Sequence, residues 1–144
     1  MATRYWIGTA SADHVAIGVA GGFAQVGHGK GGPLRRMQRG DWFVYYSPKT
    51  SLQDGEPLQA FTAIGRIADD DIYQVEMSPD FQPWRRNVTW IPVEPAPIRR
   101  LLETLSFTCG RTNWGYMFRR GHFEISGTDF VAIAESLGVD PAAI

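Results

Sequence analysis

The segment from Phe23 to Lys49, FAQVGHGKGGPLRRMQRGDWFVYYSPK, decides how this chain folds. It begins with a Gly-rich turn, continues through a basic stretch and ends in an aromatic run, Trp42–Tyr46, whose composition predicts a strand. Between them, Pro33–Gln38 predicts one helical turn with Pro at its first position. Aromatic faces next to Lys and Arg are also the groups with which proteins bind unstacked bases and phosphates. The segment therefore fits either a nucleic-acid-binding surface or an ordinary core strand beside a solvated helix.

Outward from this segment, the alternation of apolar residues and the turn residues predict further short strands. Asp70 and Asp71 are expected to form a hairpin turn between two of them. The predicted strands are Tyr5–Ala10, Gln59–Ala68, Ile72–Met77, Asn87–Val93 and His122–Ile125.

Helices are predicted at three further places. Asp13–Ala20 reads as a short helix, with Ser11 or Asp13 as its cap. Residues Ile98–Leu105 carry apolar side chains at helical spacing after Pro97, and residues 126–137 begin with a capping Ser and end before a Gly. Five or six short strands with peripheral helices predict an α+β domain built on a curled sheet or barrel.

Length and composition limit the class of protein. The 144 residues fit one domain, residues 1–144, and a hydrophobic content of 44% with 20% charged residues is typical of a globular protein. No apolar run is long enough to span a bilayer, and the N-terminus lacks the apolar core of a secretory signal. The lone Cys109 excludes an intrachain disulfide. A cytoplasmic location is therefore expected.

The net charge of −1 conceals an uneven distribution of charge. Residues 1–50 hold six Lys and Arg against two Asp, and residues 81–125 hold seven Arg against three Glu. Residues 51–80, in contrast, hold one Arg against seven Asp and Glu. If the two basic blocks converge in space, they form a positive groove with an acidic back, which suits a narrow polyanion or a single nucleotide. The alternative is that these charges lie on solvated faces.

The residues that could carry catalysis or a metal show no matching pattern. His14, His28, His122 and Cys109 share no metal-ligand spacing, so no metal or other cofactor is predicted. A catalytic thiol needs a neighbouring base, and His122 is the only close candidate in sequence for Cys109. Residues 27–32, GHGKGG, match a dinucleotide-binding string, but a long crossover helix does not follow. This Gly-rich turn could instead hold an anion through backbone N–H groups, with help from Lys30.

Six blocks in this order resemble the EVE domain, a member of the PUA-like superfamily. They cover residues 4–133 and read RYWIGTASADHV, GVAGGFAQVGHGK, PLRRMQRGDWFVYYSPKT, FTAIGRI, WRR and WGYMFRRGHFEISGTDFVAI. The resemblance implies a PUA-like pseudo-barrel of five or six mostly antiparallel strands with flanking short helices, related to YTH and ASCH domains. It also implies a reader that takes one flipped, often modified, base of DNA or RNA into a concave aromatic pocket.

The resemblance further implies a set of binding residues. Phe23 or Trp84 would stack on the base, while Gln25 and Ser47 would read its edge. The expected ligand-binding residues are Phe23, Gln25, Tyr45, Ser47, Lys49, Trp84 and Arg120, with Trp6 and Ser11 as second choices. The residues expected to hold phosphate are Lys30, Lys49, Arg85 and Arg120.

A non-enzymatic reader of modified nucleobases is the leading interpretation, and three alternatives stay open. The first is a sensor of a free nucleoside or a similar ring in the same pocket. The second is a hydrolytic or RNA-processing enzyme, for which Cys109, His122 and Glu124 are the candidate residues. The third is a dimer whose apolar surface accounts for some of the aromatic residues.

Overall fold

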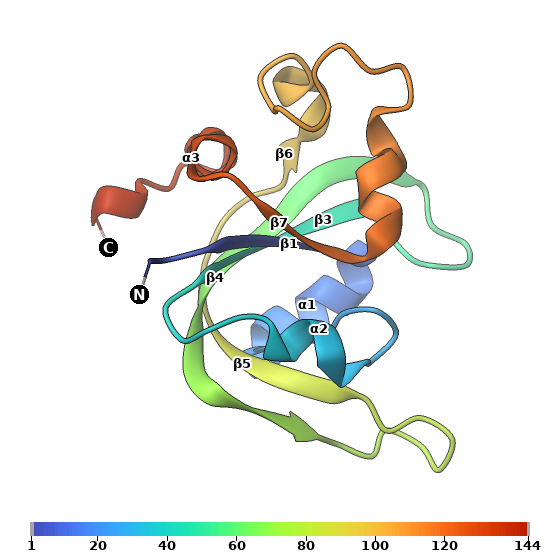
Figure 1. Ribbon diagram of the computed structural model, residues 1–144. Coiled ribbons are helices and arrows are strands. Elements are labelled where there is room, and N and C mark those ends of the chain that lie inside the picture. Colours follow the sequence, from blue (N-terminus) through green and yellow to red (C-terminus); the bar gives the residue numbers. More distant parts are fainter. Residues whose placement is uncertain (1, 144) are drawn as a thin grey trace.

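The computed structural model describes residues 2–143, which fold into one curved sheet with helices on both sides (Figure 1). The strands are β1 (Tyr5–Thr9), β2 (Phe23–Ala24), β3 (Trp42–Lys49), β4 (Pro57–Gln74), β5 (Trp84–Ile91), β6 (Ala96–Pro97) and β7 (His122–Ile125). The α-helices are α1 (Ala12–Gly21), α2 (Gly31–Arg35) and α3 (Gly127–Ser136), and the 3₁₀ helices are η1 (Ile98–Leu101), η2 (Trp114–Arg120) and η3 (Pro141–Ala143). The predicted α+β class is confirmed, with seven strands in place of five or six.

The sheet is open, and most of its strands are antiparallel. Its order is β2-β5-β4-β3-β1-β7, and the short β6 pairs with β4. The pair β1–β3 is parallel, with Tyr5 opposite Trp42 and Thr9 opposite Tyr46, whereas every other pair of named strands is antiparallel. A parallel pair requires a crossover, and residues 10–41 supply it with α1, β2 and α2.

The central strand β3 has an uninterrupted run of buried residues from Trp42 to Ser47. A strand that alternates its side chains can be buried throughout only when both faces of the sheet are covered. Its residues accordingly divide between two hydrophobic cores. Trp42, Val44 and Tyr46 point to one face, and Phe43 and Tyr45 point to the other.

We call these two regions the outer core and the inner core. The outer core is covered by α3, η1 and η2, and the inner core by α1 and α2 (Figure 1). The outer core consists of Ile7, Trp42, Val44, Tyr46, Phe61, Ile64, Ala96, Ile98, Leu105, Phe118, Phe123, Ile125, Phe130, Ile133, Ala134, Leu137 and Val139. The inner core consists of Trp6, Val15, Ala24, Val26, Leu34, Met37, Phe43, Tyr45, Ala63, Ile67 and Val88.

The long strand β4 corrects one prediction. The hairpin turn expected at Asp70 and Asp71 is wrong, because the strand continues through an irregularity between Ile67 and Ile72. Side chains of β5 satisfy the polar groups at this irregularity. Arg86 Nη2 donates to the backbone oxygen of Asp69 at 2.6 Å, and Asn87 Nδ2 donates to its carboxylate at 3.0 Å. The run of Asp residues therefore marks a bulge and not a chain reversal.

The helix predictions have mixed outcomes. The C-terminal helix is confirmed as α3, and Ser126 Oγ accepts from Asp129 N at its start. The helix predicted from Ile98 to Leu105 is wrong, because only η1 forms and turns follow it. Thr108 Oγ1 donates to the oxygens of Leu102 and Leu105, which holds these turns in place. In residues 2–143, no helix is long and apolar enough to cross a membrane.

Candidate nucleic-acid interface

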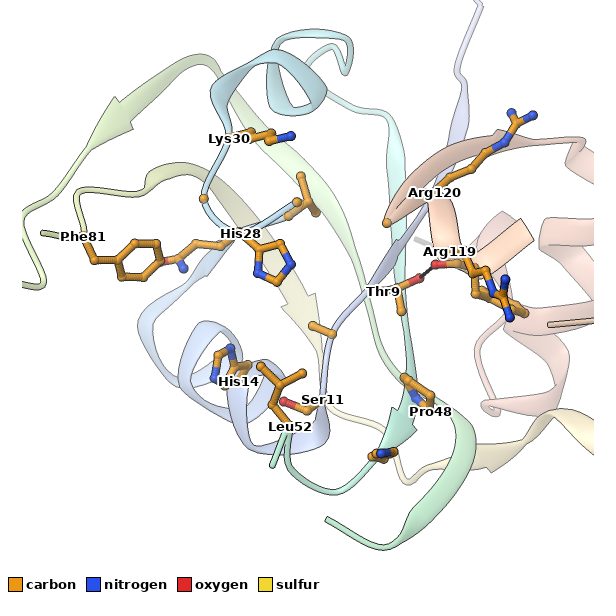
Figure 2. A pocket seen from close by; sticks show the side chains of 18 residues that line it. Thr9, Ser11, His14, His28, Lys30, Pro48, Leu52, Phe81, Arg119 and Arg120 are labelled. Atoms are coloured by element: carbon orange, nitrogen blue, oxygen red, sulfur yellow. Dashed lines mark hydrogen bonds between the residues drawn. The ribbon is translucent and has the colours of Figure 1, made fainter. Parts of the chain in front are cut away.

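A hollow of about 460 Å³ opens where β1 and β3 end (Figure 2). Its lining comes from segments that are far apart in sequence: residues 9–11, the loop 25–30, residues 48–49, Phe81 and residues 119–121. Backbone hydrogen bonds join these walls. Thr9 N donates to Gly121 O at 2.9 Å, and Ala10 N donates to Tyr46 O at 3.1 Å. The sheet therefore fixes the distance between opposite sides of the hollow.

The titratable side chains that line this hollow are all basic. They are His14, His28, Lys30, Lys49, Arg119 and Arg120, and no carboxylate belongs to the described lining. The nearest acidic residue in sequence, Asp13, is engaged, because its carboxylate accepts from Ser11 Oγ and from His14 N. Cations from the two basic blocks of the sequence thus converge on one concavity, which is the condition that the charge distribution left open. Such a surface attracts anions.

The rim of the hollow has two different sides. Lys30, Arg119 and Arg120 lie along one side in Figure 2, and Phe81, Leu52 and His14 lie along the other. Leu52 is 62% exposed and Phe81 is 38% exposed, so both apolar side chains are partly open to solvent. A ligand with an anionic end and a flat apolar end matches this division.

A smaller hollow of about 90 Å³ lies next to the first one. The two share Ala10, His14, Gln25 and Phe81. The smaller hollow is lined in addition by side chains that are mostly apolar or aromatic: Ile17, Phe23, Tyr45, Met77 and Arg85, with Gly18. Gln25 and Phe81 therefore stand at the boundary between a basic chamber and an aromatic one.

Tyr45 fixes the backbone of Gln25. Its hydroxyl accepts from Gln25 N at 2.9 Å and donates to Gln25 O at 2.7 Å. Burial raises the pKa of Tyr45, so the hydroxyl stays protonated at neutral pH and can make both bonds. The side chain of Gln25 is bound as well, because Arg85 Nε donates to Gln25 Oε1 at 2.6 Å. Arg85 in turn lies over the Phe23 ring, with Cζ 3.8 Å from the ring centroid.

The Gly-rich turn adopts an unusual backbone. Gly27, His28 and Gly29 have φ values of 55°, 60° and 86°, in the left-handed region. A Cβ on Gly29 would lie 2.5 Å from Pro83 Cβ, so only glycine permits the approach of the β4–β5 connection. The N–H groups of Gly29 and Lys30 donate to Val26 O and are therefore not available to an anion. The cationic side chain of Lys30, in contrast, does line the hollow.

The structure gathers most of the predicted binding residues at these two hollows. Ser11, Gln25, Lys30, Lys49 and Arg120 line the larger one. Phe23, Gln25, Tyr45 and Arg85 line the smaller one. Phe23 and Tyr45 are buried, at 8% and 3% exposure, so they form the back of the site more than its surface.

Three predicted residues do not reach either hollow. Trp6 is fully buried; it donates from Nε1 to Asp41 at 3.0 Å and stacks on His122. Ser47 is also fully buried, with Oγ 2.7 Å from Thr62 Oγ1. Trp84 lies under the Arg35 guanidinium, whose Cζ is 5.1 Å from the ring centroid. The Ser47 hydroxyl therefore already has a protein partner.

Sequence reasoning missed five residues that line the site: His14, His28, Leu52, Phe81 and Arg119. One signal was available for Phe81. It lies in a short turn-rich segment between Pro79 and Pro83, where an aromatic side chain has no strand or helix to bury it. His28 lies within the Gly-rich turn and Arg119 adjoins Arg120, so both stand next to residues that were predicted. His14 and Leu52 take part only because distant segments converge, which no local pattern shows.

The three residues that were considered for catalysis each contact different groups of the protein. Cys109 is exposed and lies 3.8 Å from a Glu103 oxygen, while Glu124 pairs with Arg4 at 2.6 Å. Burial, with a contribution from Arg36, lowers the pKa of His122 to about 4, so its imidazole is neutral at pH 7. Within residues 2–143, no hydrogen bond joins these three residues and no group of three or more metal-ligating side chains is found.

Comparison with known proteins agrees with this geometry. The profile of the EVE domain matches residues 4–136. A UPF0310 protein of Mycolicibacterium vanbaalenii is 56% identical over 96% of this chain and 94% of its own length. The UPF0310 protein YdcG of Bacillus subtilis is 45% identical over 97% and 96%. The YTH domain of the MRB1 protein of Zygosaccharomyces rouxii, solved in complex with N6-methyladenosine RNA, has the same fold: TM-score 0.63, 15% identity, 96% and 86% covered. The chain therefore belongs to the EVE-domain family.

Proposed function

We propose that this protein is a non-enzymatic module that binds a modified nucleobase within a DNA or RNA strand. The observation that carries the proposal is the larger hollow, whose titratable lining is entirely basic and whose rim opposite Lys30, Arg119 and Arg120 carries the apolar side chains of Leu52 and Phe81. Nucleic-acid readers combine these two elements, because phosphates need cations and an unstacked base needs a flat or apolar surface.

In this proposal the strand lies with its phosphates on the cationic side. Lys30, Arg119 and Arg120 contact the backbone there, and Lys49 contacts it at the end of β3. The base is directed toward the opposite side, where the aromatic side chain of Phe81 is 38% exposed. A volume of about 460 Å³ lies in the range of roughly 300–1,000 Å³ that is usual for small-molecule sites, which suits one nucleotide and not a duplex.

The comparisons support the class of ligand without naming it. A YTH domain that shares this fold was solved in complex with N6-methyladenosine RNA, which contains a modified base. The proposal for the present chain is coarser, since the modification and the type of strand stay open.

Fluorescence anisotropy of labelled single-stranded oligonucleotides tests this proposal. The probes carry a central cytosine, adenine, 5-methylcytosine or N6-methyladenine, and are measured at two salt concentrations. One modified probe is expected to bind more tightly than its unmodified counterpart, with affinity that falls as salt rises. Equal binding of all probes would reduce the site to a basic surface. Binding of a free nucleoside with no binding of the probes would favour a small-molecule sensor.

The variant Arg120→Gln and its control Arg100→Gln locate the binding. Both remove an exposed Arg, but only Arg120 lines the hollow, whereas Arg100 lies on η1. The first variant is expected to weaken binding and the second to leave it unchanged. The same loss in both variants would show that binding depends on net charge and not on the hollow.

A further inference from the structure

The orientation of the Gln25 amide is fixed by the chemistry of its neighbour. Arg85 Nε donates to Gln25 Oε1 at 2.6 Å. A guanidinium group has five N–H donors and no acceptor, so only the oxygen of the amide can face it. The Nε2 group is consequently the end of the amide that is turned away from the Arg85 Nε–H. Among residues 2–143, no hydrogen bond to Gln25 Nε2 is found.

Arg85 is itself held in place, so this orientation exists before a ligand arrives. Its guanidinium lies 3.8 Å above the Phe23 ring, and that ring is packed against the end of α1, where a Cβ on Gly21 would lie 2.4 Å from it. The pairing of Ala24 with Arg86 in β2–β5 brings the next residues, Gln25 and Arg85, opposite each other. Together with the two bonds from Tyr45, these contacts fix both the backbone and the side chain of Gln25.

We infer that Gln25 offers the bound base a fixed N–H donor, so that the edge of the base read at this wall carries a hydrogen-bond acceptor. The acceptor is a carbonyl oxygen or an unprotonated ring nitrogen, and an amino group at this point is rejected because two donors would meet. This inference rests on the proposed function and narrows the class of ligand. It also narrows the expectation that the amide both donates and accepts, since Oε1 is turned toward Arg85 and Nε2 is the group left for the ligand.

The variants Gln25→Met and Gln25→Glu test whether the base presents an acceptor to Gln25, presents a donor, or does not contact it. Met removes the donor, whereas Glu retains an oxygen for Arg85 and presents a second oxygen, an acceptor, to the ligand. Affinity is measured by anisotropy for the oligonucleotide that the wild type binds most tightly. Each value is divided by the affinity for the same oligonucleotide with an abasic site at the central position. This ratio cancels the general repulsion between an added carboxylate and the phosphates.

The order of the affinity ratios of the wild type and the two Gln25 variants shows which group the base presents. An acceptor on the base predicts wild type above Met above Glu, with a loss of about ten-fold for Met and a Glu ratio near one. A Glu ratio equal to or above that of the wild type would show that the base presents a donor and would overturn the inference. Equal ratios in all three proteins would show that Gln25 does not contact the base. Absence of wild-type binding to every probe would instead refute the proposed function.

Arg85→Met tests whether Arg85 positions the amide. Without the guanidinium the Gln25 amide can turn over and offer either its donor or its acceptor. The spread of affinities among probes with central cytosine, thymine, adenine and guanine is expected to shrink at least three-fold. Arg119→Met is the matched control: it removes a cation of the larger hollow and is expected to lower all four affinities equally. An unchanged spread in Arg85→Met would remove Arg85 from the inference.

Discussion

The two faces of the sheet differ in how completely their buried polar groups are satisfied. On the outer side, the buried Asp129 carboxylate accepts from Ser106 N at 3.0 Å and from Ser106 Oγ, and Thr108 Oγ1 donates to Leu102 O at 2.8 Å. On the inner side, Arg86 Nε, Trp90 Nε1 and both ring nitrogens of His122 are buried without a hydrogen-bond partner within residues 2–143. These three residues pack with or beside the inner core.

This difference suggests a hypothesis in which the outer side mainly stabilises the fold and the inner side supports the proposed binding site. Unpaired buried polar groups cost free energy, and they concentrate where a protein carries its function. The outer core gains stability from apolar packing, whereas the inner core retains polar groups and borders the hollows. Four predictions test this division, in order of decreasing effect.

Phe130→Ala is expected to cause the largest loss of stability. Phe130 is fully buried in the outer core, with its ring centroid 4.8 Å from Tyr5 and 5.2 Å from Trp42. Removing such a ring costs about 4 kcal/mol through lost burial and the cavity left behind. Urea denaturation measures this loss. Oligonucleotide affinity of the folded protein should not change, and a parallel loss of affinity would mean that the two faces are not independent.

The imidazole of His122 is expected to make stability depend on pH. Its pKa is lowered to about 4 in the folded protein, so between pH 4 and pH 6.5 the unfolded chain binds more protons. The free energy of unfolding should therefore be fully retained above pH 6.5 and fall by roughly 3 kcal/mol as pH decreases to 4. Denaturation of wild type and His122→Leu at several pH values isolates this group from the carboxylates. Identical pH profiles would contradict the prediction.

Arg86→Met is expected to destabilise the inner side by about 2 kcal/mol. Arg86 Nη1 donates to Leu34 O at 2.9 Å and to Met37 O at 2.7 Å, and thereby ties α2 to β5. Without the guanidinium these carbonyl groups lose their partner. Thermal unfolding measures the effect, with the exposed Arg100→Met as control. Equal stability of both variants would mean that water replaces these bonds at no cost.

Removing single cations from the rim is expected to have the smallest effect on stability and a defined effect on binding. Lys30→Gln and Arg120→Gln each delete one charge that lines the hollow. Each should reduce the slope of log affinity against log salt by about one, with stability changed by less than about 0.5 kcal/mol. A salt series on each variant gives the slope. Slopes equal to that of the wild type would show that these side chains do not contact phosphates.

Much of the fold was accessible from local pattern. The aromatic strand at Trp42, the capping Ser126 and the strand at His122 each carry a strong local signal, and all three formed as expected. The run Asp69–Asp71 carried an equally strong turn signal and misled, because the compensating partners, Arg86 and Asn87, lie on another strand. Local composition cannot show that side chains on another strand will form hydrogen bonds with the polar groups of a bulge.

The candidate site was accessible only in part, for a related reason. Residues next to the Gly-rich turn, such as Gln25 and Lys30, could be proposed from sequence, and the structure places both at the hollow. Whether a polar side chain can bind a ligand depends on whether another group of the protein already forms a hydrogen bond with it. Ser47 Oγ forms a hydrogen bond with Thr62 Oγ1, and Gln25 Oε1 accepts a hydrogen bond from Arg85 Nε. These pairings follow from register between strands and not from the residue type.

The parallel pair β1–β3 has a consequence for the kinetics of this molecule. The pair forms only when the crossover of residues 10–41 has closed, and long-range closure of this kind is slow because entropy is lost before contacts are gained. The same crossover carries Gln25 and Lys30. The proposed binding residues and this chain closure thus share one stretch of chain. A bound strand would bridge this crossover to Arg120, and so would slow unfolding as well as shift its equilibrium.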